Sequence, residues 1–316
     1  SMLVQAIYNI VDSIFVARLS EKALTAVTIS FPIQNIIIAF SVGLSIGVSA
    51  LLSRYLGMKN EKKASSVAVH GIILSALMSL IFVFIAIFFV EPFIKMQTND
   101  PKIISYGIDY LHIVCLFSLG VFFEIFFEKL LQSTGLTVYT MLTQVIGAVI
   151  NLILDPIFIF GLFGFPRLEV KGAAIATVTG QILGALIGLL LNLVKNKEVK
   201  LTFKGFSMSH LIFKEIFSIG LPAALMNAIT SFATFFINTI LAGFGQSAIA
   251  VYGVLFKLQS FEFMPVLGIS NAIVPIISYN FGAGNKERIK KSIELSITWA
   301  TLMIIFGMII FMVFPE

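Results

Sequence analysis

Two carboxylates interrupt apolar stretches of this sequence, and both belong to residue types that bind a cation or a proton. Asp12 lies in "YNIVDSIFVAR", and Asp155 lies in "NLILDPIFIFG". A carboxylate inside an apolar helix is costly, and such residues usually mark ion or proton pathways. Two buried carboxylates held close together can exchange a proton near neutral pH. The pair therefore predicts a site for a proton or a sodium ion; the alternative is hydrogen bonding to neighbouring helices only.

Three further polar residues are expected near these carboxylates. Asn151 precedes Asp155 by four residues, so the two side chains share one face of a helix. At helical rise, Asp12, Asp155 and Thr177 each lie about 8 to 9 Å below the outer membrane surface. Tyr8 and Asn151 fall in one deeper layer. Depth thus groups these five residues into two neighbouring layers of the outer half of the membrane.

The elements that must position these residues are membrane-spanning helices. Hydrophobic residues make up 58% of the 316, charged residues only 12%, and the mean hydropathy is +1.02, which excludes a soluble domain with a polar surface. Backbone groups in lipid are satisfied by helices, so an all-α fold is predicted. The nine expected spans are 2–16, 23–52, 64–90, 103–132, 138–160, 173–194, 211–241, 248–281 and 293–314.

Basic residues alternate between the connections of these spans. The second, fourth, sixth and eighth connections carry more than twice as many lysine and arginine residues as the odd-numbered ones. By the positive-inside rule the even-numbered connections and the N-terminus are cytoplasmic. The net charge of +5 follows this topology, so no nucleic-acid partner is expected.

The sequence repeats itself at an offset of 225 residues. "GLSIGVSALLSRYLGMKNEKK", from Gly43, aligns with "GISNAIVPIISYNFGAGNKER", from Gly268, and Gly57 then matches Gly282. The two segments are six spans apart, an even number, so both copies have the same orientation. Two six-helix bundles related by an axis along the membrane normal are predicted, and the second bundle is incomplete in this chain.

The repeat divides the chain into three parts. Residues 1–194 form an N-terminal six-helix lobe, 195–210 a lysine-rich cytoplasmic linker, and 211–316 a partial C-terminal lobe of three helices. Repeated bundles that face one another usually flank a central pathway, which favours transport over a purely structural duplication.

A substrate cavity is expected between the lobes. Lys257 lies ten residues into the eighth span, near the middle of the membrane, and Gln259 and Glu262 follow it. Glu262 lies about 140° round the helix from Lys257, so the counter-charge is expected from a substrate or another helix. Gln34 in the second span is assigned to the same cavity.

Acidic residues of the fourth span are ambiguous. Glu128 and Lys129 are expected near the cytoplasmic interface, where long side chains reach water. Glu124 is retained as a candidate for a functional role. Motifs of enzymes such as HExxH, GxSxG, a P-loop or CxxC are absent, and Asn151 to Asp155 lacks the second aspartate of a magnesium-binding motif, so no enzyme is expected.

Five segments, taken in order through the whole chain, resemble the multidrug and toxic compound extrusion (MATE) family. They are "YNIVDSIFVARLSEKALTAV", "GLSIGVSALLSRYLG", "NLILDPIFIFGLFG", "GAAIATVTGQ" and "GISNAIVPIISYNFGAGNKER". The resemblance implies twelve spans in two six-helix lobes and cation-coupled export of amphipathic, often cationic compounds. The family's N-lobe cation site would correspond to Asp12, Asn151, Asp155 and Thr177, with Tyr8 beside it, and sodium would bind at Asp12 and Asp155.

The chain departs from the family pattern at both ends, because the first span is short and the last three spans are unrepresented. A fragment is expected, and such a fragment should not transport on its own. The expected partners are small-molecule drugs or metabolites and the lipid bilayer; the protein is expected to be a monomer in a bacterial cell membrane, with a proton or sodium as coupling ion and no other cofactor. Two alternatives stay open. A flippase for lipid-linked sugars would line its cavity with several cationic residues. A channel would not need two repeated bundles that move relative to each other.

Overall fold

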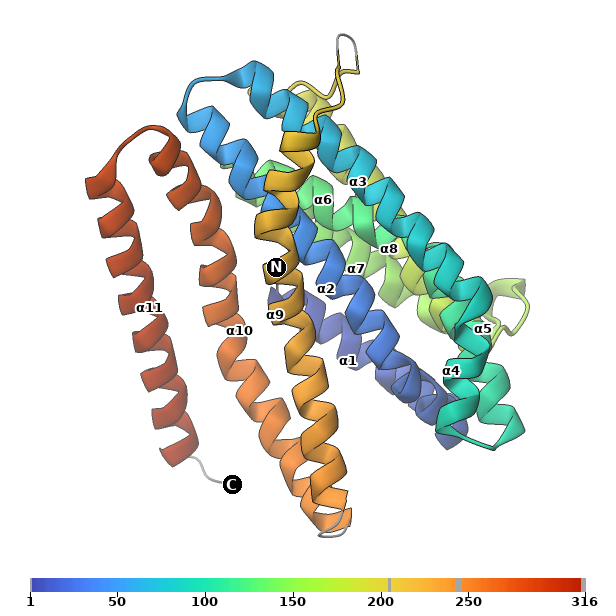
Figure 1. The fold of residues 1–316 in the computed structure, drawn as a ribbon. Coiled ribbons are helices and arrows are strands. Elements are labelled where there is room, and N and C mark those ends of the chain that lie inside the picture. The colour runs from blue at the N-terminus through green and yellow to red at the C-terminus, as the bar shows by residue number, and fades with distance from the viewer. Residues whose placement is uncertain (1, 204–205, 243–245, 314–316) are drawn as a thin grey trace.

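The computed structural model describes residues 2–203, 206–242 and 246–313 (Figure 1). The side chains of residues 2–10 and of most residues between 230 and 262 lie outside this description. Within it the regular elements are all helical, as predicted. They are α1 (Met2–Leu19), α2 (Glu21–Gly57), α3 (Glu61–Phe88), α4 (Val90–Gln97), α5 (Pro101–Leu116), α6 (Leu119–Ser133), α7 (Thr137–Phe160), the 3-10 turn η1 (Leu162–Gly164), α8 (Val170–Lys195), α9 (His210–Ala242), α10 (Gln246–Gly282) and α11 (Lys286–Val313).

The helices match the predicted spans closely. Seven helices in the described chain are long and apolar enough to cross a membrane, and the number is eight if the bent pair of α5 and α6 is counted as one span. The first predicted span corresponds to α1, a helix of 18 residues that is not counted among these. The protein is thus a polytopic helical membrane protein.

The fourth span was predicted as one continuous helix over 103–132, and this prediction is wrong. α5 and α6 meet at a bend of 47°. The amide of Ser118 bonds to the carbonyl of Cys115, three residues back, instead of continuing the α-helical pattern. The Ser118 hydroxyl donates to the carbonyl of Ser79 on α3 at 3.4 Å. A contact with a neighbouring helix therefore stabilises the break, and no proline marks it.

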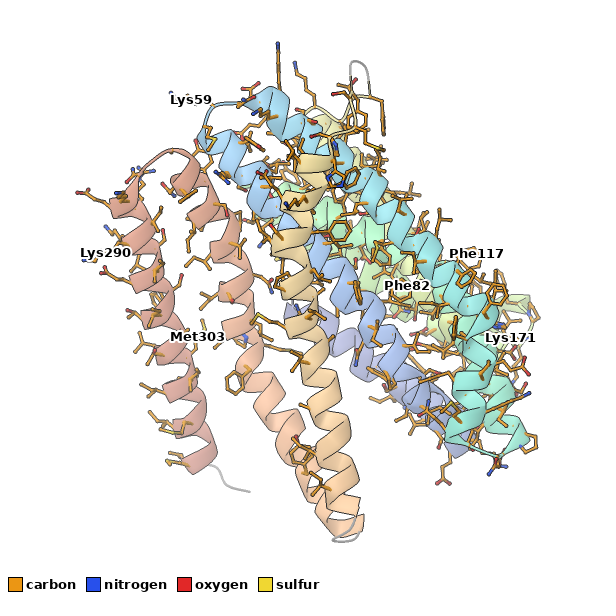
Figure 2. All side chains as sticks on the ribbon, viewed as in Figure 1. Lys59, Phe82, Phe117, Lys171, Lys290 and Met303 are labelled. Carbon is orange, nitrogen blue, oxygen red and sulfur yellow. The ribbon has the colours of Figure 1, made fainter. Side chains whose placement is uncertain are left out.

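The connections rich in lysine and arginine gather at one end of the bundle. Figure 2 shows Lys59 and Lys290 toward this end, which we call the lysine-rich end, and Lys171 toward the other. The turns between α2 and α3 and between α10 and α11, and the connection from α8 to α9, all lie at the lysine-rich end (Figure 1). The predicted alternation requires this segregation; the side of the membrane that this end faces stays a prediction.

Helix α2 lies at the centre of the fold and packs against α3, α5, α6, α9 and α10. Glycines on α2 let α9 approach closely. A Cβ added to Gly43 would stand 2.5 Å from the Cβ of Ala224, and one added to Gly47 would overlap the carbonyl oxygen of Ile216. Small residues at such crossings are how membrane helices gain van der Waals contact.

The two copies of the repeat touch each other reciprocally through α2 and α10. A Cβ added to Gly57 would overlap the Tyr279 carbonyl oxygen, and one added to Gly282 would overlap the Arg54 carbonyl oxygen. Arg54 and Tyr279 are related by the same offset as the two glycines. A reciprocal contact of this kind is what a two-fold relation produces. It agrees with the predicted parallel repeat.

The connection between α8 and α9 is held against α3. The amide of Lys200 donates to the Ser65 hydroxyl at 3.0 Å, and the amide of Ser209 donates to Nε2 of His70 at 2.9 Å. The ring of His70 also meets the rings of Phe206 and Phe213 edge-on. The division into lobes at 1–194 and 211–316, with this linker between them, stays a prediction.

Candidate cation site

Three of the five predicted site residues are joined by hydrogen bonds. Asn151 and Asp155 stand one turn apart on α7, and Thr177 stands opposite them on α8. Nδ2 of Asn151 donates to Oδ1 of Asp155 and to Oγ1 of Thr177, both at 3.4 Å. The exposed fractions are 2% for Asn151, 0% for Asp155 and 4% for Thr177. The polar group is therefore enclosed by the protein.

Glycines bring α7 and α8 close enough for this network. A Cβ added to Gly180 on α8 would stand 2.8 Å from the Gly147 carbonyl oxygen and 3.3 Å from the Cβ of Asn151. Near the start of α8, Gly172 packs just as closely on the backbone of Phe158 of α7. The short interhelical distance explains how a side chain as small as that of Thr177 reaches Asn151.

Asp12 approaches this group from a third helix, α1. It is 8% exposed on α1, and α1 packs against α7. The Asp12 carboxylate is near enough to that of Asp155 for their charges to interact. The structure thus brings four of the predicted residues to one place inside the bundle.

The site contains more acceptors than donors. Oδ1 of Asp12, Oδ1 of Asn151 and Oδ2 of Asp155 are buried with no hydrogen-bond partner in the described part of the chain. Leaving a buried acceptor without a partner costs about 1 to 3 kcal/mol, more for a charged group. A proton or a monovalent cation would satisfy these oxygens. Carboxylate and amide oxygens are hard ligands of the kind that bind hard cations.

A divalent metal centre finds little support among the side chains that are described. No group of three or more His, Cys, Asp or Glu residues there could hold a metal ion.

The remaining predicted residues are Tyr8, Gln34, Lys257, Gln259 and Glu262. The side chains of Tyr8, Lys257, Gln259 and Glu262 lie outside the described residues, so their roles stay predictions. Gln34 on α2 accepts a hydrogen bond from the Tyr110 hydroxyl of α5 at 3.4 Å, so it contacts helices of the N-terminal half. Its predicted place in a substrate cavity also stays a prediction.

The buried position of Glu128 was not foreseen. The sequence placed it near the membrane interface, but its exposed fraction is 6%. It accepts hydrogen bonds from Nε2 of Gln144 at 2.7 Å and from the Thr143 hydroxyl at 3.3 Å. The missed signal is that Thr143 and Gln144 follow the α6–α7 turn at about the distance at which Glu128 precedes it. Asp109 of α5 pairs with Lys171 of α8 at 3.2 Å.

The fold and the buried polar group together define a polytopic helical membrane protein built on a parallel internal repeat. The family model MatE matches residues 1–157 and 222–316, and the chain belongs to this family. The resemblance found in the sequence is therefore confirmed.

Two relatives of this chain are named as a transporter and an export protein. The chain is 29% identical over 297 residues to a protein named "FAD transporter" of Shewanella oneidensis, covering 92% of this chain and 64% of that protein. It is 30% identical over 296 residues to "Multidrug export protein MepA" of Staphylococcus haemolyticus, covering 93% of this chain and 64% of that protein. The chain thus spans about 64% of the length of these curated relatives.

Solved structures give the same family relation. A transporter of the MOP superfamily from Pyrococcus furiosus superposes with a TM-score of 0.93 at 28% identity, over 99% of this chain and 69% of that chain. A structure described as the outward-facing conformation of a multidrug resistance MATE family transporter gives the same TM-score, identity and coverage.

Proposed function

We propose that the protein to which this chain belongs is a cation-coupled antiporter that exports amphipathic, often cationic compounds by alternating access. The observation that carries the proposal is the set of buried, unpartnered oxygens at Asp12, Asn151 and Asp155. Membership of the MatE family and the similarity to "Multidrug export protein MepA" support export of drugs.

The chemistry of coupling follows from the site. Asp12 and Asp155 would bind a proton or sodium, with Asn151 and Thr177 orienting the carboxylates. A cation that binds one arrangement of the two halves more tightly than the other shifts the equilibrium between them. By linkage, drug binding and cation binding then oppose each other, so the cation gradient drives drug release on the outer side.

The proposal also covers the orientation of the protein in the membrane, its oligomeric state and the residues of its substrate cavity. The lysine-rich end would face the cytoplasm of a bacterial cell, since cytoplasmic connections carry the excess of basic residues. The protein would act as a monomer, with Gln34, Lys257, Gln259 and Glu262 contributing to the substrate cavity.

A second candidate substrate class has one specific support. Lys257 is a basic residue on α10, and one relative is named as a transporter of FAD, an anionic dinucleotide. Transport of an anionic nucleotide cofactor is therefore the alternative to transport of cationic drugs. A sugar-lipid flippase and a channel remain weaker alternatives for the reasons drawn from the sequence.

The test uses the full-length protein in liposomes. Movement of a cationic dye and of FAD is followed under an imposed proton gradient, under a sodium gradient and under none. Dye movement that accelerates with one gradient supports the proposal. Dye movement at the same rate with either gradient and without one contradicts cation coupling and favours a channel.

A further inference from the structure

The face of α7 that carries Asp155 and Asn151 continues toward the lysine-rich end of the bundle. Gly147, Gln144 and Thr140 follow on it at spacings of three or four residues, which keep side chains on one helix face. From Asp155 to Gln144 this face covers about 16 Å at helical rise. The question is whether the predicted site is connected along it to the lysine-rich end.

Glu124 reaches this face from α6. Its Oε1 atom lies 3.2 Å from the position of a Cβ on Gly147 of α7 and 2.7 Å from that of a Cβ on Gly184 of α8. The carboxylate therefore occupies the space that the missing side chains leave between two helices. Glu124 is partly exposed, and among the described residues its carboxylate has no hydrogen-bond or ion-pair partner.

Backbone oxygens fill the interval between Asn151 and Glu124. The Gly147 carbonyl oxygen faces Gly180, and the Gly180 carbonyl oxygen lies 3.2 Å from the position of a Cβ on Gly147. Gly180 also lies against Asn151, as described above. Because neither glycine has a side chain, the backbones of α7 and α8 lie in direct contact between Asn151 and Glu124.

Glu128 continues the line one turn further along α6. It accepts hydrogen bonds from Thr143 and Gln144, and Oε1 of Gln144 is buried without a partner. The next residue, Lys129, donates to Gln132 at 2.9 Å and to Asn271 of α10 at 3.5 Å. Glu128 thus ends the line beside a basic residue and near the α6–α7 turn.

We propose that Glu124 relays the coupling cation between the Asp12–Asp155 site and Glu128, and so connects the site to the lysine-rich end of the protein. The inference rests on the proposed function and extends it, because it adds a route for the cation. A proton or a sodium ion would pass from carboxylate to carboxylate past the carbonyl oxygens of Gly147 and Gly180.

The charged neighbours of Glu124 are few. On α6 they are Glu128 and Lys129, and on α7 the nearest is Asp155. Helix α8 carries no charged residue between Lys171 and Lys195. The relay therefore depends on this short series of carboxylates, with Lys129 as the basic group at its end.

The test compares Glu124→Gln, which keeps size and hydrogen bonding but removes the charge, with Glu124→Asp, which keeps the carboxylate. Glu294→Gln on α11 is the matched control, because Glu294 is an exposed glutamate outside the line, with a side chain 62% exposed. The full-length variants are reconstituted in liposomes. Gradient-driven dye efflux and dye exchange without a gradient are both measured.

Glu124→Gln should slow gradient-driven efflux roughly tenfold or more, the scale of coupling between two sites, while exchange without a gradient continues. Glu124→Asp should recover part of the driven rate, and Glu294→Gln should match the unmodified protein. Equal driven rates in Glu124→Gln and the unmodified protein overturn the relay. Loss of driven efflux and exchange together, in a variant that still folds, also overturns it by making Glu124 a structural residue.

A second readout does not depend on transport. A water-soluble carbodiimide, added only at the lysine-rich end in oriented liposomes, should modify Glu124, as read by mass spectrometry. Absence of modification from that side overturns the relay. If the unmodified protein responds to neither gradient, the proposed function fails first and the relay with it; if only the Glu124 variants disagree, the relay alone fails.

Discussion

Gly57 on α2 and Gly282 on α10 occupy equivalent positions in the repeat, and each contacts the backbone of the other's helix. Gly57 meets the carbonyl of Tyr279, and Gly282 meets that of Arg54. The guanidinium of Arg54 also lies over the ring of Phe281, 5.3 Å from its centre. The two helices therefore close against each other at the lysine-rich end, where the proposed alternating-access mechanism would require a contact that can open.

A bulky side chain at this contact should open that end. Gly57→Leu places atoms where the Tyr279 carbonyl lies, so α2 and α10 must separate from their close approach toward the usual interhelical distance of about 8 to 10 Å. Spin labels at Lys59 and Lys286 should report an increase of about 2 Å or more. Gly268→Ala on α10, the helix that Gly57 contacts, is the control, because none of the described atoms lies within 4 Å of its Cβ position. An unchanged distance in Gly57→Leu contradicts a tight contact here.

Thr177 should stabilise the site through its hydroxyl. Thr177→Val keeps the shape but removes the oxygen that accepts from Asn151, and hydrogen bonds inside membrane bundles contribute about 0.6 kcal/mol on average. Thermal unfolding of the purified protein should show a loss of this order. Thr177→Ser, which retains the hydroxyl, should lose less. Equal stability of the Val and Ser variants would show that the bond to Asn151 has no energetic role.

Acid should weaken the contact between the start of α2 and the start of α5. Lys22 donates to Asp100 at 2.6 Å, and this hydrogen bond, with help from the amides of Ile103 and Lys102, lowers the pKa of Asp100 below its ordinary value of 3.8. A carboxylate with a lowered folded-state pKa stabilises the fold above its unfolded pKa, and this contribution is lost as pH falls through the folded pKa.

Lys22→Gln should therefore lower stability at neutral pH and make no difference well below pH 3.8. The measurement is thermal unfolding of both proteins across that range, repeated at high salt, which screens an exposed pair. Lys95→Gln is the comparison, since Lys95 pairs with Glu91 within one helix at 2.5 Å. A difference for Lys22→Gln that persists in acid would contradict the assignment to Asp100.

Much of the fold could be predicted from the sequence. The length of an apolar stretch is a local signal, and the repeat is a periodic one. The predicted runs recur as helices, and the offset that pairs Gly57 with Gly282 reappears as a reciprocal contact. The break between α5 and α6 could not be predicted, since it depends on Ser118 bonding to Ser79 of another helix.

The site was predictable to a similar extent. Asn151 and Asp155 share a helix face by spacing alone, and matching depth brought in Thr177 and Asp12. The burial of Glu128 depends on Gln144 across a turn, and the position of Glu124 depends on glycines contributed by two other helices. Such neighbours are fixed by packing, so spacing along one helix cannot reveal them.

Lys257 should affect drug choice more than ion dependence, because it lies on α10 in the other half of the repeat. In Lys257→Ala of the full-length protein, the ratio of rates for a cationic dye and for FAD should change, while the response to proton or sodium gradients stays the same. A changed ion response with an unchanged substrate ratio would assign Lys257 to coupling instead.

The central claim is that the carboxylates of Asp12 and Asp155 bind the coupling cation, and gradient-driven efflux by Asp12→Asn tests it most directly. The asparagine keeps the size and hydrogen bonding of the side chain but removes the carboxylate, and Asp155→Asn should behave similarly. Asp109→Asn is the matched control, since Asp109 pairs with Lys171 outside the site. In liposomes, Asp12→Asn should lose gradient-driven efflux by roughly tenfold or more while still binding drug. Efflux by Asp12→Asn with unchanged pH and sodium dependence would contradict the account and leave Asp12 as a structural hydrogen-bonding residue.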